Sequence, residues 1–364
     1  MLEHPRRTFR TLDGMRGAAA FAVMTHHAGW LFGPLHMRHA YMAVDLFFVL
    51  SGFVLAFAYQ ARFEAGMSAA AFMRMRLIRL YPLYLLGIVF SGAWIAFNLF
   101  FQREVFLAQT QSWTWEQFRT SLLHSIFFLP SPTLGAGPPA LYPLNIAAWS
   151  LLFELVINGV YALLWRWLTP RVLVALVTVS AIWLGWDSLH HGSLNHGWTW
   201  NGVGVALSRV CFSFFAGVLI HFVAQRLSAS MRVSPYVLIA LMLVLLYVKP
   251  PAPFLGVYDL LCAIVLFPLL VLLGTRTEPG TRAQAVFAFS GLVSYALYAV
   301  HYPLIFVATD ALLALGLDAG NLGPWSGLVF SVLVIAGCWL LDRFYDVPLR
   351  AVLSPRPAQR AFTR

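Results

Sequence analysis

The sequence predicts an all-α polytopic membrane protein with about ten transmembrane helices. Sixty per cent of its 364 residues are hydrophobic and 10% are charged, whereas soluble globular chains carry about a quarter charged residues. The mean hydropathy is +0.76, and the chain has room for about ten apolar runs of roughly 20 residues. No length remains for a large soluble domain. Membrane topology explains the net charge of +10 without a nucleic-acid partner.

Apolar runs place the individual spans. Eight runs have full spanning length, and two shorter ones lie at 171–186 and 236–248. The eight longer runs are 12–33, 41–61, 81–101, 146–168, 202–224, 254–274, 285–308 and 324–342. A further run, 121–129, is too short to cross and lies in the Pro- and Gly-rich stretch 102–145. The first run lacks a small-residue cleavage pattern, so we expect a retained span rather than a signal peptide.

The basic residues set the orientation of these spans. If 121–129 does not cross, 19 of the 24 basic residues fall on one side, which the positive-inside rule assigns to the cytoplasm. Both termini are then cytoplasmic, and 121–129 is re-entrant or lies against the outer surface. Residues 1–350 form one transmembrane domain, followed by a basic tail at 351–364 that is suited to anionic lipid. The basic residues assigned to the outer side are Arg38, Arg103, Arg119 and Lys249.

Ionisable side chains at membrane depth mark a candidate site. Each costs about 2.5–3.5 kcal/mol on insertion scales, so such residues are rare and usually functional. Given the predicted orientation, five of them from five different spans fall in the outward half of the membrane. These five are His27, Asp45, Glu154, Arg209 and His301.

A second cluster lies at the predicted cytoplasmic side. The stretch "MRMRLIRLYPLY" places Arg76 and Arg79 one helical turn apart, just before Tyr81, and Arg16 enters the membrane at the same depth. Arginine forks match phosphate oxygens, so this cluster is suited to a polyanion. The alternative is that these arginines only anchor helix ends to lipid headgroups.

Spacing along the first span connects the two clusters. Arg16 and His27 are eleven residues apart, so they share one helix face about 16 Å apart along the axis, and His26 points about 100° away. A long, thin ligand with an anionic head at the cytoplasm would present its far end to His27. Acyl-coenzyme A has that shape, with phosphates, a pantetheine arm and a reactive thioester.

The residues around this helix resemble those of the membrane-bound acyltransferase 3 family. "LDGMRGAAAFAVMTHHAG" fits its signature of an arginine, ten residues and a histidine. The resemblance continues, in order, through "VDLFFVLSGFVLA", "RLIRLYPLY", "WSLLFE", "SRVCFSFFAGVLI" and "GLVSYALYAVHYPL". It implies transfer of an acyl group, usually acetyl, from cytoplasmic acyl-coenzyme A to a hydroxyl of a cell-surface or exported glycan. It also implies a multi-pass protein of the bacterial inner (plasma) membrane.

The resemblance assigns roles to particular positions. His27 falls at the catalytic histidine, Arg16 at its partner, and Glu154 at the acidic position that follows Trp149 and Ser150. The usual C-terminal Glu-x-Pro is replaced by "YDVPLR", a departure from the family pattern. No extracellular esterase-like domain follows the last span, so a stand-alone form is expected.

These observations lead to a hypothesis of direct transfer. His27 is the general base, and Asp45 or Glu154 orients its ring. Arg209 and the backbone near Ser51 stabilise the oxyanion, and Trp149, Ser150, Ser51, Arg209 and His301 contact substrate. A mechanism through a covalent acyl-histidine intermediate is the alternative to direct transfer. The competing structural interpretation is that Glu154 is only an ion-pair partner of Arg209, and that Asp45 is a buried charge needing a partner.

A transporter or proton-coupled permease is the rival class, because intramembrane His, Asp and Glu suit it equally. No inverted repeat is found, and the arginine cluster has no obvious use in such a protein. The loop "HHGSLNHGW" has histidines but neither acidic nor cysteine partners, so no metal site is expected. The sequence does not identify the acceptor or the oligomeric state.

Overall fold

The computed structural model describes residues 8–101, 113–132, 139–227 and 233–354. Within these ranges the chain is a bundle of α-helices and contains no strand beyond one isolated bridge between Ala140 and Thr199. The helices are α1 (Arg10–His27), α2 (Gly29–Phe32), α3 (Ala43–Glu64), α4 (Ala69–Phe100), α5 (Trp115–Ile126), α6 (Trp149–Leu164), α7 (Pro170–His191), α8 (Val203–Arg226), α9 (Pro235–Tyr247), α10 (Leu255–Leu261), α11 (Phe267–Gly274), α12 (Thr281–Ala314), α13 (Trp325–Leu341) and α14 (Val347–Leu353). The predicted all-α fold is confirmed.

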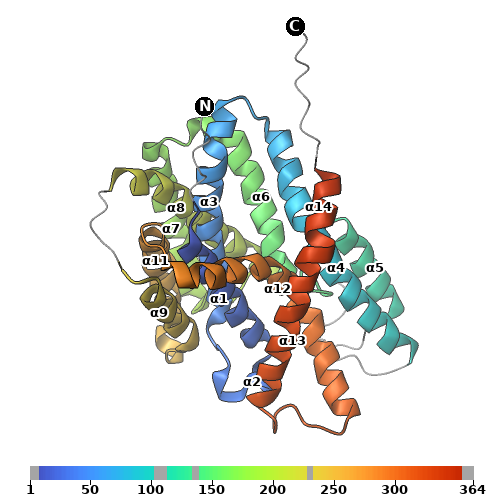
Figure 1. The fold of residues 1–364 in the computed structure, drawn as a ribbon. Helices are drawn as coiled ribbons and strands as arrows, with labels where there is room; N and C mark the ends of the chain where they lie inside the picture. Colours follow the sequence, from blue (N-terminus) through green and yellow to red (C-terminus); the bar gives the residue numbers. More distant parts are fainter. Residues whose placement is uncertain (1–7, 102–112, 133–138, 228–232, 355–364) are drawn as a thin grey trace.

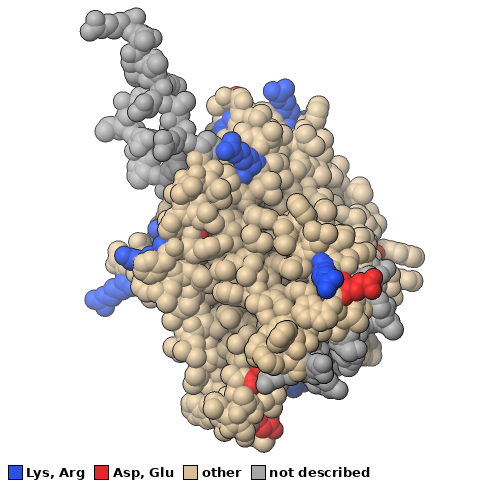
Figure 2. Space-filling view, turned by 90° about the vertical axis from the view of Figure 1, so that its right-hand side faces the viewer, with Lys and Arg blue, Asp and Glu red and all other residues tan. Residues whose placement is uncertain are grey.

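The helices account for the predicted spans. Eight helical segments of the described chain are long and apolar enough to cross a membrane. The two remaining predicted spans correspond to α1, which carries three charged residues near its start, and to α9, with 13 residues. In Figure 1, α2 and the beginning of α13 lie at one end of the bundle and α14 lies at the other. The face in Figure 2 is mostly uncharged across its middle.

Close helix–helix approach organises the centre of the bundle. Helix α1 packs against α12, and α3 packs against α8. A Cβ added at Gly52 of α3 would overlap the Phe214 carbonyl of α8, and one at Gly217 would overlap the Val49 carbonyl. Glycine at these two positions therefore lets the backbones of α3 and α8 touch, which brings their polar side chains together.

Helix α5 contains residues 121–126 of the short run 121–129, for which the arginine distribution predicts a re-entrant or surface position. Its 12 residues span about 18 Å, too short for the bilayer core. It lies against α4, where the Tyr84 hydroxyl donates to the Ser125 carbonyl at 2.7 Å. The chain then turns back at Phe128, whose φ of 58° is left-handed. The short length of α5 thus agrees with the prediction that 121–129 does not cross the membrane.

Parts of two predicted segments lie outside the described residues. Helix α14 ends at Leu353, and the predicted basic tail continues from there into residues that are not described. The stretch 102–145 is described only at 113–132 and from residue 139, so Arg103 is not placed.

Candidate active site

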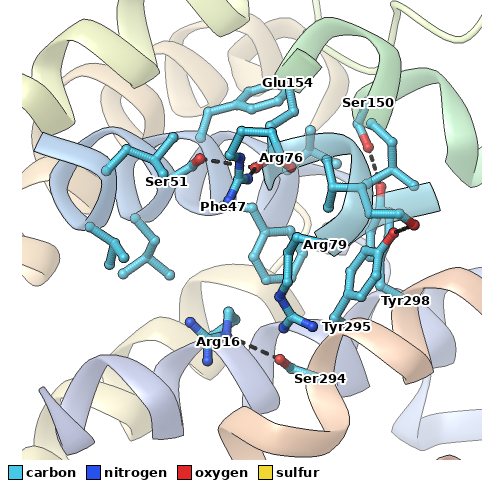
Figure 3. Close-up of a pocket in the computed structure, with 17 residues that line it drawn as sticks. Arg16, Phe47, Ser51, Arg76, Arg79, Ser150, Glu154, Ser294, Tyr295 and Tyr298 are labelled. Carbon is cyan, nitrogen blue, oxygen red and sulfur yellow. Dashed lines mark hydrogen bonds and ion pairs between the residues drawn. The ribbon is translucent and has the colours of Figure 1, made fainter. Parts of the chain in front are cut away.

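Helix α1 connects two cavities in the centre of the bundle. The first, here called the inner cavity, has a volume of about 220 Å³ and is lined by Arg16, Arg76 and Arg79 (Figure 3). The second, the central cavity, has a volume of about 320 Å³ and is lined by His27. Because α1 runs unbroken from Arg10 to His27, the expected spacing of Arg16 and His27 on one rigid helix is present in the structure.

The two cavities meet at a shared wall. Val44 of α3 and Tyr298 of α12 line both of them. The Tyr298 hydroxyl lies 2.6 Å from the Ser150 hydroxyl and donates to the Ala147 carbonyl at 3.1 Å. These bonds fix the Tyr298 side chain across the boundary. A ligand that reaches from the inner cavity to His27 has to pass this point.

His27 is paired with His301 of α12. The Nδ1 atom of His27 lies 2.8 Å from Nε2 of His301, and the two rings are nearly parallel. The Nδ1 atom of His301 lies 3.0 Å from the carbonyl oxygens of both Leu297 and Tyr298. A carbonyl only accepts hydrogen bonds, so Nδ1 of His301 carries the proton.

This pairing fixes the tautomers of the neutral rings. With its proton on Nδ1, His301 accepts at Nε2, and His27 must donate to it from Nδ1. The Nε2 atom of His27 therefore keeps its lone pair, and it makes no hydrogen bond to any described residue. A ring nitrogen in this state, on the wall of a cavity, is suited to accept a proton.

His26 and His27 have different surroundings, as the spacing argument expects. His26 lies near His36 and Tyr41, with ring centroids 5.9 Å from each. Its Nδ1 atom is buried without a partner. His27, by contrast, packs edge-on against Tyr302 with ring centroids 5.6 Å apart. The Tyr302 hydroxyl is bonded to no described residue, so it is free to donate to a substrate oxygen.

Arg209 and Asp45 form a buried ion pair at the edge of the central cavity. The distance from Nη2 of Arg209 to Oδ2 of Asp45 is 2.6 Å, and both side chains are at most 1% exposed. The remaining N–H groups of Arg209 donate to the carbonyls of Leu194, His196 and Tyr41 at 2.9–3.0 Å. All five guanidinium donors are thus used by the protein.

Because every N–H of Arg209 is already bonded, the structure differs from the roles expected for Arg209 and Asp45. Arg209 has no N–H left for a developing oxyanion. The Asp45 carboxylate is bonded to Arg209, and within the described chain the side-chain partner of His27 is His301 instead. The backbone near Ser51 belongs to the middle of α3, where each N–H already bonds within the helix, so it offers no oxyanion donor either.

Glu154 lies in the inner cavity and not beside His27. Its Oε1 accepts from Nη2 of Arg76 at 2.6 Å and from the Ser51 hydroxyl at 3.0 Å (Figure 3). The alternative expectation was an ion pair between Glu154 and Arg209. The structure instead gives each of these two residues a different partner. Glu154 positions Arg76 in the cavity wall, while Arg209 engages Asp45.

The arginines of the inner cavity keep unused donors. Arg16 bonds through Nε to Ser294 and through Nη2 to Asp13 and Gly291, which leaves both N–H groups of Nη1 free. The Nε atom of Arg76 is buried with no partner. Such spare donors, in a cavity with more arginines than carboxylates, match the expected polyanion site.

Asp346 contacts an arginine of the inner cavity, and the sequence did not reveal this contact. This fully buried carboxylate, in the place of the family's usual glutamate, lies 3.3 Å from Nη1 of Arg79 and 2.7 Å from Nη2 of Arg350. Asp346 therefore pairs with one arginine of the inner cavity, Arg79, and with Arg350 on α14. The sequence does mark this residue in one way, because Asp346 falls at the position of the glutamate in the Glu-x-Pro motif of the family.

Tyr81 and Trp149, two further candidate residues, lie at different parts of the structure. Tyr81 is not at the inner cavity, because its side chain faces α5 and donates to the Ile126 carbonyl at 2.7 Å. Trp149 lines the central cavity and lies under the guanidinium of Arg209, 5.4 Å from ring centroid to Cζ. Among the described residues, no group of three or more His, Cys, Asp or Glu side chains is arranged to hold a metal ion.

The fold and the paired cavities define a multi-pass membrane protein with a polar site buried between its helices. A model of the acyltransferase 3 family, described as an acyltransferase domain, matches residues 9–343. The chain therefore belongs to this family and is a membrane acyltransferase, which decides against the permease alternative.

Named relatives agree with this assignment. The chain is 35% identical to protein 2 in the picA locus of Rhizobium radiobacter, over 50% of this chain and 95% of that protein. It is 23% identical to the peptidoglycan O-acetyltransferase OatA of Listeria monocytogenes, over 95% of this chain and 56% of OatA. It is 28% identical to the acyltransferase MdmB of Streptomyces mycarofaciens, over 64% of this chain and 51% of MdmB. The chain thus matches little more than half the length of OatA and MdmB. No solved structure matches the chain.

Proposed function

We propose that this protein moves an acyl group, most simply acetyl, from cytoplasmic acyl-coenzyme A to a hydroxyl of a glycan or glycosylated molecule at the outer side of a bacterial inner membrane. Family membership and the name of MdmB support acyl transfer, and the name of the O-acetyltransferase OatA supports transfer to an oxygen. The observation that carries the proposal is the meeting of an arginine-lined cavity with a histidine-lined cavity at Val44 and Tyr298.

The inner cavity supports the choice of donor. Arg16, Arg76 and Arg79 face a space open to phosphate groups at the predicted cytoplasmic side. From Arg16 to His27 the distance along α1 is about 16 Å, which an extended pantetheine arm can cover. In this arrangement the thioester passes the shared wall and lies beside His27.

The chemistry follows from the tautomer of His27. Its Nε2 takes the proton of the acceptor hydroxyl as the oxygen attacks the thioester carbon. The Tyr302 hydroxyl donates to the carbonyl oxygen as that atom gains charge. Collapse of the tetrahedral intermediate breaks the C–S bond, and the proton on Nε2 passes to the departing sulfur. His301 acts as a positioning residue, because it holds the ring of His27 through Nδ1.

The proposal is tested with purified protein in lipid nanodiscs. Acetyl-coenzyme A is supplied with a panel of hydroxyl-bearing sugars, and both free thiol and acetylated sugar are measured. The proposal requires both products in equal amounts. Acetyl phosphate in place of acetyl-coenzyme A tests the donor, and equal transfer from it would contradict the assignment. Mass spectrometry of acid-quenched protein without acceptor tests for an acyl-His27 intermediate.

Arg16→Gln is expected to weaken donor binding. Loss of charge-assisted bonds to a phosphate should raise the KM for acetyl-coenzyme A by about 10- to 100-fold, with a smaller change in kcat. The matched control is Arg74→Gln, because Arg74 is exposed on α4 and does not line the inner cavity. An unchanged donor KM in Arg16→Gln, or equal effects of both variants, would contradict the phosphate role.

His301→Leu and His301→Gln are expected to differ in kcat. Leucine accepts no hydrogen bond, so the ring of His27 loses its positioning partner, and kcat should fall by about 10²-fold. Glutamine can accept from Nδ1 of His27 through Oε1 and should restore part of that loss. Donor KM should stay near the wild-type value in both variants. Equal loss in the two, or a change confined to thermal stability, would show that His301 only packs.

A further inference from the structure

A third cavity, here called the outer vestibule, adjoins the central cavity away from the arginine cluster of the inner one. It has a volume of about 370 Å³ and is lined by His36, Arg38 and Lys249, among others. His26, Tyr41 and Asn195 line both the vestibule and the central cavity. The vestibule therefore adjoins the central cavity that His27 lines, with these three side chains between them, at the end predicted to face outward.

The charge of the vestibule is unusual for its side of the membrane. Positive residues are scarce on the predicted outer face, and two of the four assigned to it, Arg38 and Lys249, meet in this one cavity. They come from different parts of the chain, one before α3 and the other after α9. Topology favours basic residues on the opposite side, so orientation in the membrane does not explain this pair.

The surroundings leave the positive charge unbalanced. No carboxylate lines the vestibule among the described residues. Burial, followed by the charges of Arg38 and Lys249, lowers the pKa of His36 below its ordinary value. The Nε2 atom of His36 is buried without a partner. The cavity thus has positive charge and an unused polar atom, but no resident anion.

The carboxylate behind the vestibule wall is occupied. Asp259 is fully buried and accepts hydrogen bonds from the Tyr41 hydroxyl at 2.9 Å, the Ser193 hydroxyl at 3.1 Å and the Leu194 N–H at 2.7 Å. Its other oxygen lies 2.6 Å from Nε2 of His39. These bonds fix the wall that carries Tyr41, and they leave Asp259 no direct contact with a ligand in the cavity.

From this arrangement we infer that the acceptor is an anionic sugar, whose carboxylate or phosphate binds Arg38 and Lys249 while a hydroxyl reaches His27. The inference rests on the proposed function and names the acceptor class for the same site. The charged group stays in the wet vestibule, where it keeps part of its hydration, and the neutral part of the sugar enters the central cavity. Arg38 and Lys249 select the acceptor, and they take no part in the bond-breaking step.

Binding of matched sugars tests the inference without relying on turnover. Methyl glucuronoside is compared with its uncharged methyl ester, and glucose 1-phosphate with glucose, by calorimetry on the protein in neutral-lipid nanodiscs. The acid or the phosphate should bind at least about tenfold more tightly than its neutral counterpart. The stronger of the two anions identifies carboxylate or phosphate as the preferred group.

The variant Arg38→Gln/Lys249→Gln should abolish this preference. Arg119→Gln is the matched control, because Arg119 is exposed on α5, is assigned to the same side and does not line the vestibule. It should retain the preference. Equal binding of charged and neutral sugars, or a preference that survives in the double variant, overturns the inference, and equal binding is the result expected if the two residues only anchor lipid headgroups. Failure of the proposed function is a separate result, namely no thiol release by wild-type protein with any sugar.

Discussion

His27→Ala is expected to reduce acceptor-dependent thiol release by about 10²- to 10⁴-fold, the range attributed to a positioned general base. His27 is the residue whose Nε2 faces the central cavity with a lone pair, and alanine offers no substitute. The KM for acetyl-coenzyme A should change little, because the arginines of the inner cavity remain. The measurement is steady-state release of thiol with a fixed acceptor, together with a thermal unfolding midpoint.

His26→Ala is the control for that result. The two histidines are adjacent, but His26 lies near His36 and Tyr41, and in the described chain the hydrogen bond to His301 comes from His27. We expect its loss to lower thiol release by less than about tenfold, since it supplies no proton acceptor to the reacting atoms. A larger loss in His26→Ala than in His27→Ala would contradict the assignment of the base.

Arg209→Met is expected to destabilise the protein by about 3–5 kcal/mol, because removal of one partner leaves Asp45 as an uncompensated buried charge. Three backbone carbonyls, of Tyr41, Leu194 and His196, also lose their donor. The readout is unfolding of purified protein by heat and by denaturant in a fixed detergent. Loss of activity with an unchanged unfolding midpoint would instead indicate a direct role in catalysis.

A second substitution sharpens this test. In the Arg209→Met background the unpaired carboxylate of Asp45 lowers the stability, so the additional change Asp45→Leu should recover part of the lost stability. In the wild-type background Asp45→Leu should destabilise, because it leaves Arg209 unpaired. Additive effects of the two changes would show that Asp45 and Arg209 do not act as a pair.

The fold follows closely from the sequence because the bilayer restricts the possible solutions. Apolar runs of spanning length must be helices, and the arginine distribution predicts that 121–129 does not cross, which agrees with the 12-residue length of α5. The connection from Arg16 to His27 was also predictable, since a single rigid helix fixes both distance and direction between its residues. Geometry within one element is therefore readable from spacing alone.

Geometry between elements was not predictable in the same way. Depth in the membrane places Asp45, His27 and His301 at similar heights, but it does not say which helix faces turn toward one another. The sequence therefore favoured a carboxylate partner for His27, whereas the structure places His301 there. The contact between α1 and α12, set by close packing at Gly17 and Ser290, decides the pairing.

The expected separation of Glu154 from Arg76 also differs from the structure, in which the two side chains are paired. The sequence treats α6 as a span that starts at the outer surface. In the structure the first turn of α6 already contacts α12, where the Ser150 hydroxyl lies 2.6 Å from the Tyr298 hydroxyl. Glu154 lies one turn further on and therefore joins Arg76 at the inner cavity.

The wall at Val44 and Tyr298 has a consequence for the membrane as an electrical insulator. In the proposed chemistry one acyl group travels outward past this wall, and one proton travels inward on the thiol of coenzyme A. The acceptor exchanges a proton for the acyl group, and coenzyme A exchanges the acyl group for a proton. Neither molecule changes its charge, so no net charge is displaced across the bilayer. Tyr298, which is bonded to Ser150 and Ala147, lies at the boundary that the acyl group crosses in this exchange. On the proposed function, the modification of a molecule at the outer side therefore draws no current from the ion gradients across the same membrane.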